Sequence, residues 1–206
     1  IDIEKNYGKN FVEKNEFILN KLSLKKSGLY IFHGPPSGGK TSYIKYLVQK
    51  SKRPFIFVSP SLVGDIDSPH FISTLINYDN PVLILEDAEK AVLDRKNSTD
   101  SSVVSTLLNL SDGILSSMLR VSLIVTFNTL RNDIDEALIR KGRLVCEHEF
   151  GPLSAEGANL LAKSLGVKAK FDKPTMLGEI YNYNEKYSEN SFQRKKGEKL
   201  IGFGFN

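Results

Sequence analysis

The chain has 206 residues, 40% of them hydrophobic and 25% charged, so it can bury one full core and one small additional subdomain. Its formal net charge of +4 is too small to predict nucleic-acid or membrane binding by itself, and it leaves an anionic partner open. The single cysteine, Cys146, excludes a disulfide-stapled secreted scaffold and favours a reducing, cytoplasmic location.

Short apolar runs alternate with helical patterns along the first 150 residues. We predict strands at residues 29–32, 55–58, 82–85, 121–126 and 145–150. These runs are nearly all apolar, which is typical of parallel strands that are covered by helices on both faces. Helices are predicted between them, at residues 41–50, 69–78, 102–116 and 135–141. The alternation predicts an α/β sandwich.

The strand pattern stops after Phe150. Apolar residues recur at helical spacing over residues 154–165, and Gly166 is a suitable C-cap. We therefore expect an α/β core at 1–150, a small helical subdomain at 151–184 and a basic, mobile or docking tail at 185–206. No apolar run approaches the roughly 20 residues that cross a bilayer, and residues 1–14 lack a signal core, so neither a membrane segment nor a targeting peptide is expected.

A glycine-rich loop follows the first predicted strand. Residues 34–41 read Gly-Pro-Pro-Ser-Gly-Gly-Lys-Thr, which fits G-x-x-x-x-G-K-[ST] between a strand and a helix. Backbone N–H groups of such a loop enclose phosphate oxygens. Lys40 would neutralise the β- and γ-phosphates, and the Thr41 hydroxyl would be a ligand of Mg²⁺.

Polar residues follow two further strands. Glu86 and Asp87 come directly after the run 82–85, where one acid can act through the Mg²⁺ shell and the other can polarise an attacking water. Asn128 follows the fourth strand and is expected beside the γ-phosphate, although a turn-forming asparagine fits the same pattern. Arg140 and Arg143 are three residues apart, so both would point the same way and could stabilise phosphoryl charge on a neighbouring subunit, unless they are ordinary surface arginines.

Taken in order, these elements resemble those of an AAA+ ATPase. Walker A corresponds to residues 34–41, Walker B to 82–87, sensor 1 to Asn128, and the arginine fingers to Arg140 and Arg143. The chain looks most like the Bcs-type branch, which is named for the mitochondrial translocase of the Rieske protein. The features that suggest this branch are the acid order Glu86-Asp87, residues 101–113 and residues 135–143, which approach D-x-A-L-x-R-x-G-R.

The resemblance implies a P-loop fold with a five-stranded parallel sheet, a helical lid from about Gly151 and a homo-oligomeric ring, a hexamer or heptamer, with nucleotide sites between subunits. The implied function is hydrolysis of ATP with Mg²⁺ to remodel or move a partner macromolecule. Glu86, Asp87, Asn128, Arg140 and Arg143 would be catalytic, and Thr41, Glu86 and Asp87 would hold the metal. The implied ATP-binding residues are Tyr7, Gly8, Pro36, Ser37, Gly38, Gly39, Lys40, Thr41 and Ser42.

Two other functions remain open on the sequence. The basic tail is compatible with a nucleic-acid-associated loader or remodelling ATPase. The acids Glu86-Asp87 stand in the reverse of the commoner Asp-Glu order, and Val145 stands where the family usually has an acid. Both departures are compatible with an assembly switch that binds ATP without hydrolysing it. Residues 61–64 carry no aromatic side chain where threading members have one, which argues against threading of an unfolded polypeptide.

Overall fold

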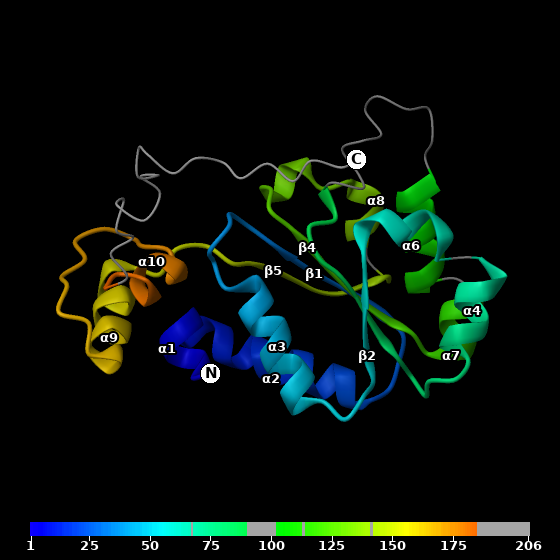
Figure 1. Ribbon diagram of the computed structural model, residues 1–206, viewed down its shortest axis with the longest axis horizontal. Helices are drawn as coiled ribbons and strands as arrows, with labels where there is room; N and C mark the ends of the chain where they lie inside the picture. The colour runs from blue at the N-terminus through cyan, green and yellow to red at the C-terminus, as the bar shows by residue number, and fades with distance from the viewer. Residues whose placement is uncertain (67, 90–101, 113, 141, 185–206) are drawn as a thin grey trace, which may run out of the picture.

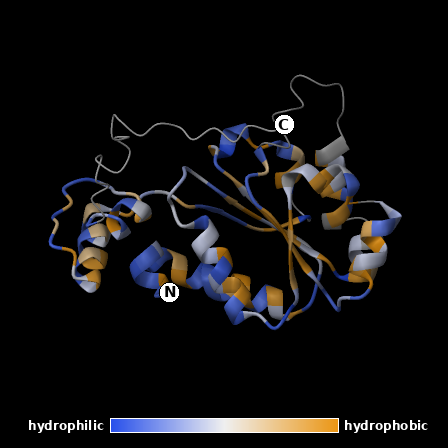
Figure 2. Ribbon diagram, in the orientation of Figure 1, coloured by the Kyte–Doolittle hydropathy of each residue, from blue (hydrophilic) through white to orange (hydrophobic). Residues whose placement is uncertain are grey.

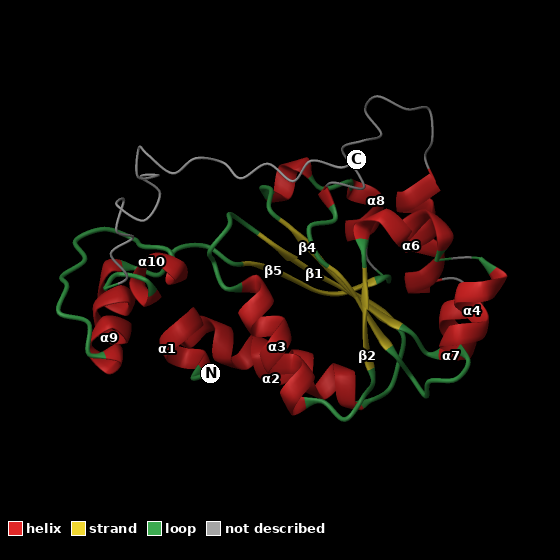
Figure 3. Cartoon of the chain, in the orientation of Figure 1, coloured by secondary structure: helices red, strands yellow, loops and turns green. Residues whose placement is uncertain are grey.

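A computed structural model describes residues 1–66, 68–89, 102–112, 114–140 and 142–184. Its centre is a five-stranded sheet in which every pairing is parallel (Figures 1 and 3). The spatial order is β2-β3-β4-β1-β5. The strands are β1 (Gly28–His33), β2 (Phe55–Val58), β3 (Val82–Leu85), β4 (Ser122–Phe127) and β5 (Leu144–Glu149). The predicted α/β fold with a five-stranded parallel sheet is confirmed.

One face of the sheet is covered by helices from the middle of the chain. Leu29, Leu83 and Leu123 point to this face and form a core with Leu107 and Leu138. The covering elements are η1 (Pro60–Asp65), α4 (Pro69–Leu75), α6 (Ser102–Asp112) and α8 (Glu136–Ile139), and α7 (Ile114–Leu119) follows α6. Figure 2 shows the hydrophobic strands between this layer and the more polar helices on the other side.

The opposite face is covered by α2 (Lys9–Ser23) and α3 (Lys40–Lys50). Tyr30, Phe32 and Ile84 point to this side, where they pack with side chains of both helices. Because successive strand residues point to opposite faces, a run that is apolar at every position fills both cores. This is why β1, β3 and β4 lack the alternating pattern of a half-exposed sheet, whereas the edge strands β2 and β5 are only partly buried.

Two helices follow β5 and pack on each other beside α1 (Ile3–Tyr7). They are α9 (Ala155–Leu165) and α10 (Leu177–Tyr181), with Leu161 and Ile180 in their shared core. The side chain of Ser154 caps the first turn of α9, and Gly166 ends that helix with φ of 72°. The expected helix over 154–165, with its glycine cap, is therefore confirmed.

Some element boundaries differ from the sequence prediction. The expected helix 69–78 ends at Leu75, and the expected helix 102–116 is two helices, α6 and α7. The expected helix 135–141 is only four residues long, because Arg140 takes an extended conformation at its C-cap. The tail 185–206 lies outside the described residues. None of the helices in the described ranges is both long enough and apolar enough to cross a membrane.

Candidate nucleotide site

The strand order brings the polar strand ends to one edge of the sheet. β4 lies between β1 and β3, so Asn128 falls between the glycine-rich loop that follows β1 and the acids that follow β3. In an open parallel sheet, ligands bind beyond the carboxyl ends of the strands. The site therefore follows from the pairing of strands that are far apart in the sequence.

The glycine-rich loop connects β1 to the first turn of α3. Its backbone has positive φ at Gly34, Ser37 and Gly39, with values of 120°, 66° and 92°. A Cβ on Gly39 would lie 2.6 Å from Leu177 Cδ2, so the Leu177 side chain would have to shift. Such conformations need glycine in most cases, which explains why glycines occupy two of these three positions.

The Lys40 side chain lies inside this loop. Its Nζ donates hydrogen bonds to the carbonyl oxygens of Gly34 at 2.6 Å and Pro35 at 2.9 Å. Burial lowers the pKa of Lys40 from its usual value, and the carboxylates of Glu89, Asp87 and Glu86 oppose that effect. The ammonium group is thus held at the loop by backbone oxygens and by the field of three acids.

The two adjacent acids after β3 have different partners. Glu86 Oε1 accepts a hydrogen bond from Thr41 Oγ1 at 2.6 Å, whereas Asp87 Oδ1 accepts one from Asn128 Nδ2 at 2.6 Å. Asp87 adopts φ of 54°, and its N–H donates to Thr126 Oγ1 at 3.0 Å. This left-handed turn directs the two carboxylates to opposite partners, one on α3 and one at the end of β4.

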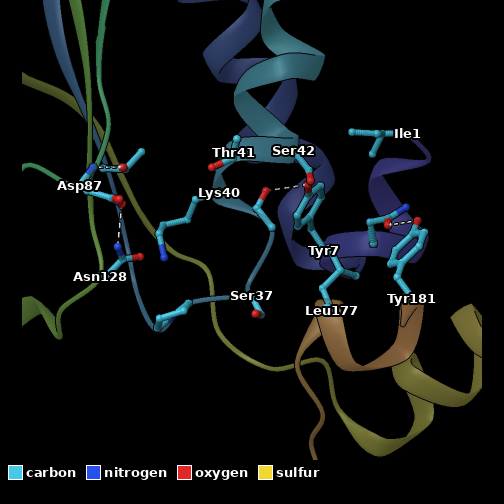
Figure 4. A pocket seen from close by; sticks show the side chains of 15 residues that line it. Ile1, Tyr7, Ser37, Lys40, Thr41, Ser42, Asp87, Asn128, Leu177 and Tyr181 are labelled. Atoms are coloured by element: carbon cyan, nitrogen blue, oxygen red, sulfur yellow. Dashed lines mark hydrogen bonds between the residues drawn. The ribbon is translucent and has the colours of Figure 1, made fainter. Parts of the chain in front are cut away.

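A cavity of about 460 Å³ extends from the acids to the N-terminal helix. Figure 4 shows Asp87 and Asn128 at one end, Lys40 and Thr41 in the middle, and Tyr7 and Tyr181 toward the other end. Tyr7 donates its hydroxyl hydrogen to Gly39 O at 3.1 Å, and Tyr181 donates to Asn6 Oδ1 at 2.6 Å. The cavity therefore joins a charged end to an aromatic end.

Most of the predicted ATP-binding residues line this cavity, but not all of them do. Gly38 lies against Phe150 and lines a neighbouring cavity of about 260 Å³ with His148 and Tyr7. Gly8 lies between α1 and α2, and Glu86 does not line the cavity but accepts a hydrogen bond from Thr41, which does. The predicted residues in the lining are Tyr7, Pro36, Ser37, Gly39, Lys40, Thr41, Ser42, Asp87 and Asn128.

The two arginines lie outside the cavity lining. Arg140 is exposed at the end of α8, and Arg143 is half-buried in the turn that leads to β5. The N–H of Arg143 donates to Arg140 O at 3.4 Å, so a turn that follows the end of α8 separates the two arginines. Within one subunit, these guanidinium groups do not form part of the cavity.

Glu89, which contacts the lining residue Asn128, and Tyr181, which lines the cavity, were not predicted. Glu89 accepts hydrogen bonds from both the backbone and the side chain of Asn128. The only sequence signal for it was a third acid shortly after Glu86 and Asp87. Asn6 and Tyr181 are 175 residues apart, so nothing in the local pattern indicated their contact.

Comparison with known proteins identifies the class. Residues 30–152 match the model of the ATPase family associated with various cellular activities (AAA), and the chain belongs to this family. Among curated relatives, it is 27% identical over 167 residues to AAA-ATPase At5g17760 from Arabidopsis thaliana, covering 75% of this chain and 32% of that protein.

Two mitochondrial chaperones are also similar. The chain is 30% identical to the human mitochondrial chaperone BCS1, over 59% of this chain and 31% of that protein. It is 29% identical to the bovine protein of the same name, over 61% of this chain and 32% of that protein. The resemblance to the Bcs-type branch is confirmed, and the chain spans about a third of the length of these relatives.

Proposed function

We propose that this chain binds ATP with Mg²⁺ and hydrolyses it at the interface with a neighbouring subunit, in order to remodel or move a partner macromolecule. The observation that carries the proposal is that the two adjacent acids have different hydrogen-bond partners: Glu86 contacts Thr41, and Asp87 contacts Asn128. A chain that only bound a phosphate group would need the loop and Lys40 but not this second pair.

The residues fit Mg²⁺ as the metal. Hydroxyl and carboxylate oxygens are the ligands this ion prefers, and the 2.6 Å contact brings the oxygens of Thr41 and Glu86 together. In the described part of the chain, no group of three or more His, Cys, Asp or Glu side chains could hold a metal. That agrees with an ion bound through one or two protein groups and the phosphates. When bound, Mg²⁺ would neutralise charge on the β- and γ-phosphate oxygens.

Asp87 is the proposed general base. Its carboxylate lies at the charged end of the cavity, and it is held by Asn128 rather than by Thr41. A water that is hydrogen-bonded to Asp87 and to the Asn128 amide oxygen could give a proton to the carboxylate while its lone pair attacks the γ-phosphorus. The bond from that phosphorus to the bridging oxygen would then break, and ADP would leave with that oxygen. Lys40 would leave the carbonyls of its own loop and turn to the phosphate oxygens, which are stronger acceptors.

The opposite end of the cavity would hold the adenine ring. Tyr7 and Tyr181 provide apolar faces, and Leu177 adds an aliphatic wall. We include residues 151–184 in the proposal as a lid, because α10 contacts the glycine-rich loop through the hydrogen bond from Gly178 N–H to Ser37 O at 3.0 Å. Binding of the base would then influence the position of α10.

Ring assembly completes the proposed site. Arg140 and Arg143 do not line their own cavity, so they would act on the nucleotide of a neighbour in a hexamer or heptamer. The substrate is proposed to be a protein of unknown identity. A cytoplasmic location also stays a prediction, since two relatives are named as mitochondrial chaperones.

The Lys40→Ala variant tests nucleotide binding and hydrolysis together. Because Lys40 is the cation held inside the loop, we expect the variant to lose ATP binding while it keeps its circular dichroism spectrum.

Asp87→Asn should bind ATP but release phosphate at least about 100-fold more slowly, since general-base contributions are of that size. If wild-type protein bound ATP without releasing phosphate in the presence of Mg²⁺, the non-hydrolysing switch would replace the proposed ATPase.

A further inference from the structure

Asn128 is held by carboxylates on two sides. Its backbone N–H donates to Glu89 Oε2 at 3.1 Å, and its amide nitrogen Nδ2 donates to Glu89 Oε1 at 3.0 Å. The same Nδ2 donates to Asp87 Oδ1 at 2.6 Å. Glu89 therefore uses both of its oxygens on one residue, and the two Nδ2 hydrogens of Asn128 are directed to two different acids.

This arrangement permits only one orientation of the amide. Ionised carboxylates accept hydrogen bonds but cannot donate them, so the amide oxygen of Asn128 cannot face Glu89 and Asp87 without repulsion. The NH₂ group must face the acids, and the oxygen must face away from them. In Figure 4 the Asn128 nitrogen points to Asp87 and its oxygen lies on the side of Lys40.

Glu89 reaches Asn128 because of the local backbone. Asp87 turns the chain with φ of 54°, and the next residue, Ala88, is fully buried with its N–H bonded to Thr126 O at 2.9 Å. Ala88 thus anchors the segment to the end of β4. Glu89 follows immediately and is directed back along the same strand end, where Asn128 begins the next loop.

We propose that Glu89 is a positioning residue that fixes the Asn128 amide with its oxygen toward the cavity, so that this oxygen can accept a hydrogen bond from the attacking water. The inference rests on the proposed ATPase function and deepens it. Without the Glu89 carboxylate, the amide could rotate and present its NH₂ group to the water. That group would donate a hydrogen bond to the water's oxygen and so occupy a lone pair that is needed to attack phosphorus. Glu89 does not line the cavity, and in this proposal it acts on the water only through Asn128.

Glu89→Gln tests this role with little change in size. We expect kcat to fall by about 10- to 100-fold, as is common when a partner that orients a catalytic group is lost, while ATP affinity and the unfolding temperature change little. Glu16→Gln, at an exposed position of α2, is the matched control and should behave like wild type. Unchanged kcat in Glu89→Gln would overturn the inference.

A double-mutant cycle separates an indirect role from a direct one. If Glu89 acts only through Asn128, then Glu89→Gln should change kcat by less than about twofold in an Asn128→Ala background. An equal loss in both backgrounds would mean that Glu89 acts on the reaction without Asn128, and the positioning role would be wrong.

A spectroscopic measurement keeps the inference separate from the ATPase proposal. The side-chain NH₂ resonances of Asn128 can be identified by their loss in Asn128→Ala. In Glu89→Gln they should shift and exchange faster with water, and in Glu16→Gln they should not. Absence of ATP hydrolysis by wild type would refute the proposed function, whereas unchanged Asn128 resonances in Glu89→Gln would refute the positioning role.

Discussion

Arg53 is a buried cation near the amino ends of β3 and β4, at the end of the sheet opposite to the nucleotide site. Arg53 is 7% exposed, and in the described part of the chain its guanidinium donates hydrogen bonds to hydroxyl and carbonyl oxygens rather than to a carboxylate. Burial lowers the pKa of the Arg53 guanidinium, but the group has enough hydrogen-bond donors to compensate for lost water. The acceptors are the Ser122 hydroxyl and the carbonyls of Leu22, Asn80, Pro81 and Arg120.

We expect Arg53→Met to lower the free energy of unfolding by about 3 kcal/mol or more, because several buried carbonyls would lose their donors. Urea denaturation followed by circular dichroism measures the change. Lys52→Met, at the exposed neighbouring position, is the control and should stay within about 0.5 kcal/mol of wild type. A similarly small change for Arg53→Met would show that the bonds of Arg53 do not stabilise the fold.

At the scale of elements, α10 is held close to the glycine-rich loop. A Cβ on Gly178 would lie 2.9 Å from the Ser37 Cβ, whereas a Cβ on Gly157 in α9 would meet nothing closer than 3.4 Å. Both glycines are helical, so alanine favours each helix by itself. The two positions therefore differ in the room available for a Cβ atom, and not in backbone conformation.

Gly178→Ala should move α10 away from the glycine-rich loop and weaken nucleotide binding. Overpacking of this kind costs about 1–3 kcal/mol, so we expect a loss of affinity of about tenfold. Isothermal titration with ATP measures it. Gly157→Ala should bind like wild type and be equally stable or more stable. Equal affinities of the two variants would argue against a role for α10 in holding the nucleotide.

The element pattern was largely predictable, and the exceptions have local causes. Strands β1 and β4 were predicted to within one or two residues at each end, because both are buried throughout. The helix before β5 was predicted too long, because Arg140 and Gly142 leave the helical conformation, Gly142 with φ of 104°. The residue at which a helix ends depends on the backbone angles of single residues, and the spacing of apolar residues does not predict those angles.

At the scale of the whole molecule, the proposed ring makes Arg140 and Arg143 active only in trans. Replacing both with alanine should reduce ATP hydrolysis by about a thousandfold or more with much smaller effects on ATP binding. Mixing this protein with Lys40→Ala should restore part of the activity. In mixed interfaces, one subunit has an intact glycine-rich loop and its neighbour supplies the guanidinium groups.

Native mass spectrometry provides the control for the mixing experiment. Mixed oligomers without any recovery of hydrolysis would mean that the arginines do not act in trans. Monomeric wild-type protein that hydrolyses ATP at full rate would also contradict the prediction, and Arg140 and Arg143 would then have only structural roles.

The class of fold and the chemical groups at the charged end of the site could be predicted from local features of the chain. A loop of fixed spacing between a strand and a helix, and acids directly after an apolar strand, are local features, so residues 34–41, Glu86 and Asp87 could be recognised without coordinates. Asn128 followed from the same logic, since the carboxyl ends of parallel strands meet at one edge.

The pairing of these groups could be seen only in the folded chain. Which acid meets Thr41 and which meets Asn128 depends on the turn at Asp87 and on the position of β4 between β1 and β3. The hydrogen bonds from Asn128 to Glu89 connect the segments that follow β4 and β3. The hydrogen bond from Tyr181 to Asn6 connects the two ends of the described chain. Contacts at such separations arise from strand pairing and helix packing, which no local sequence pattern records.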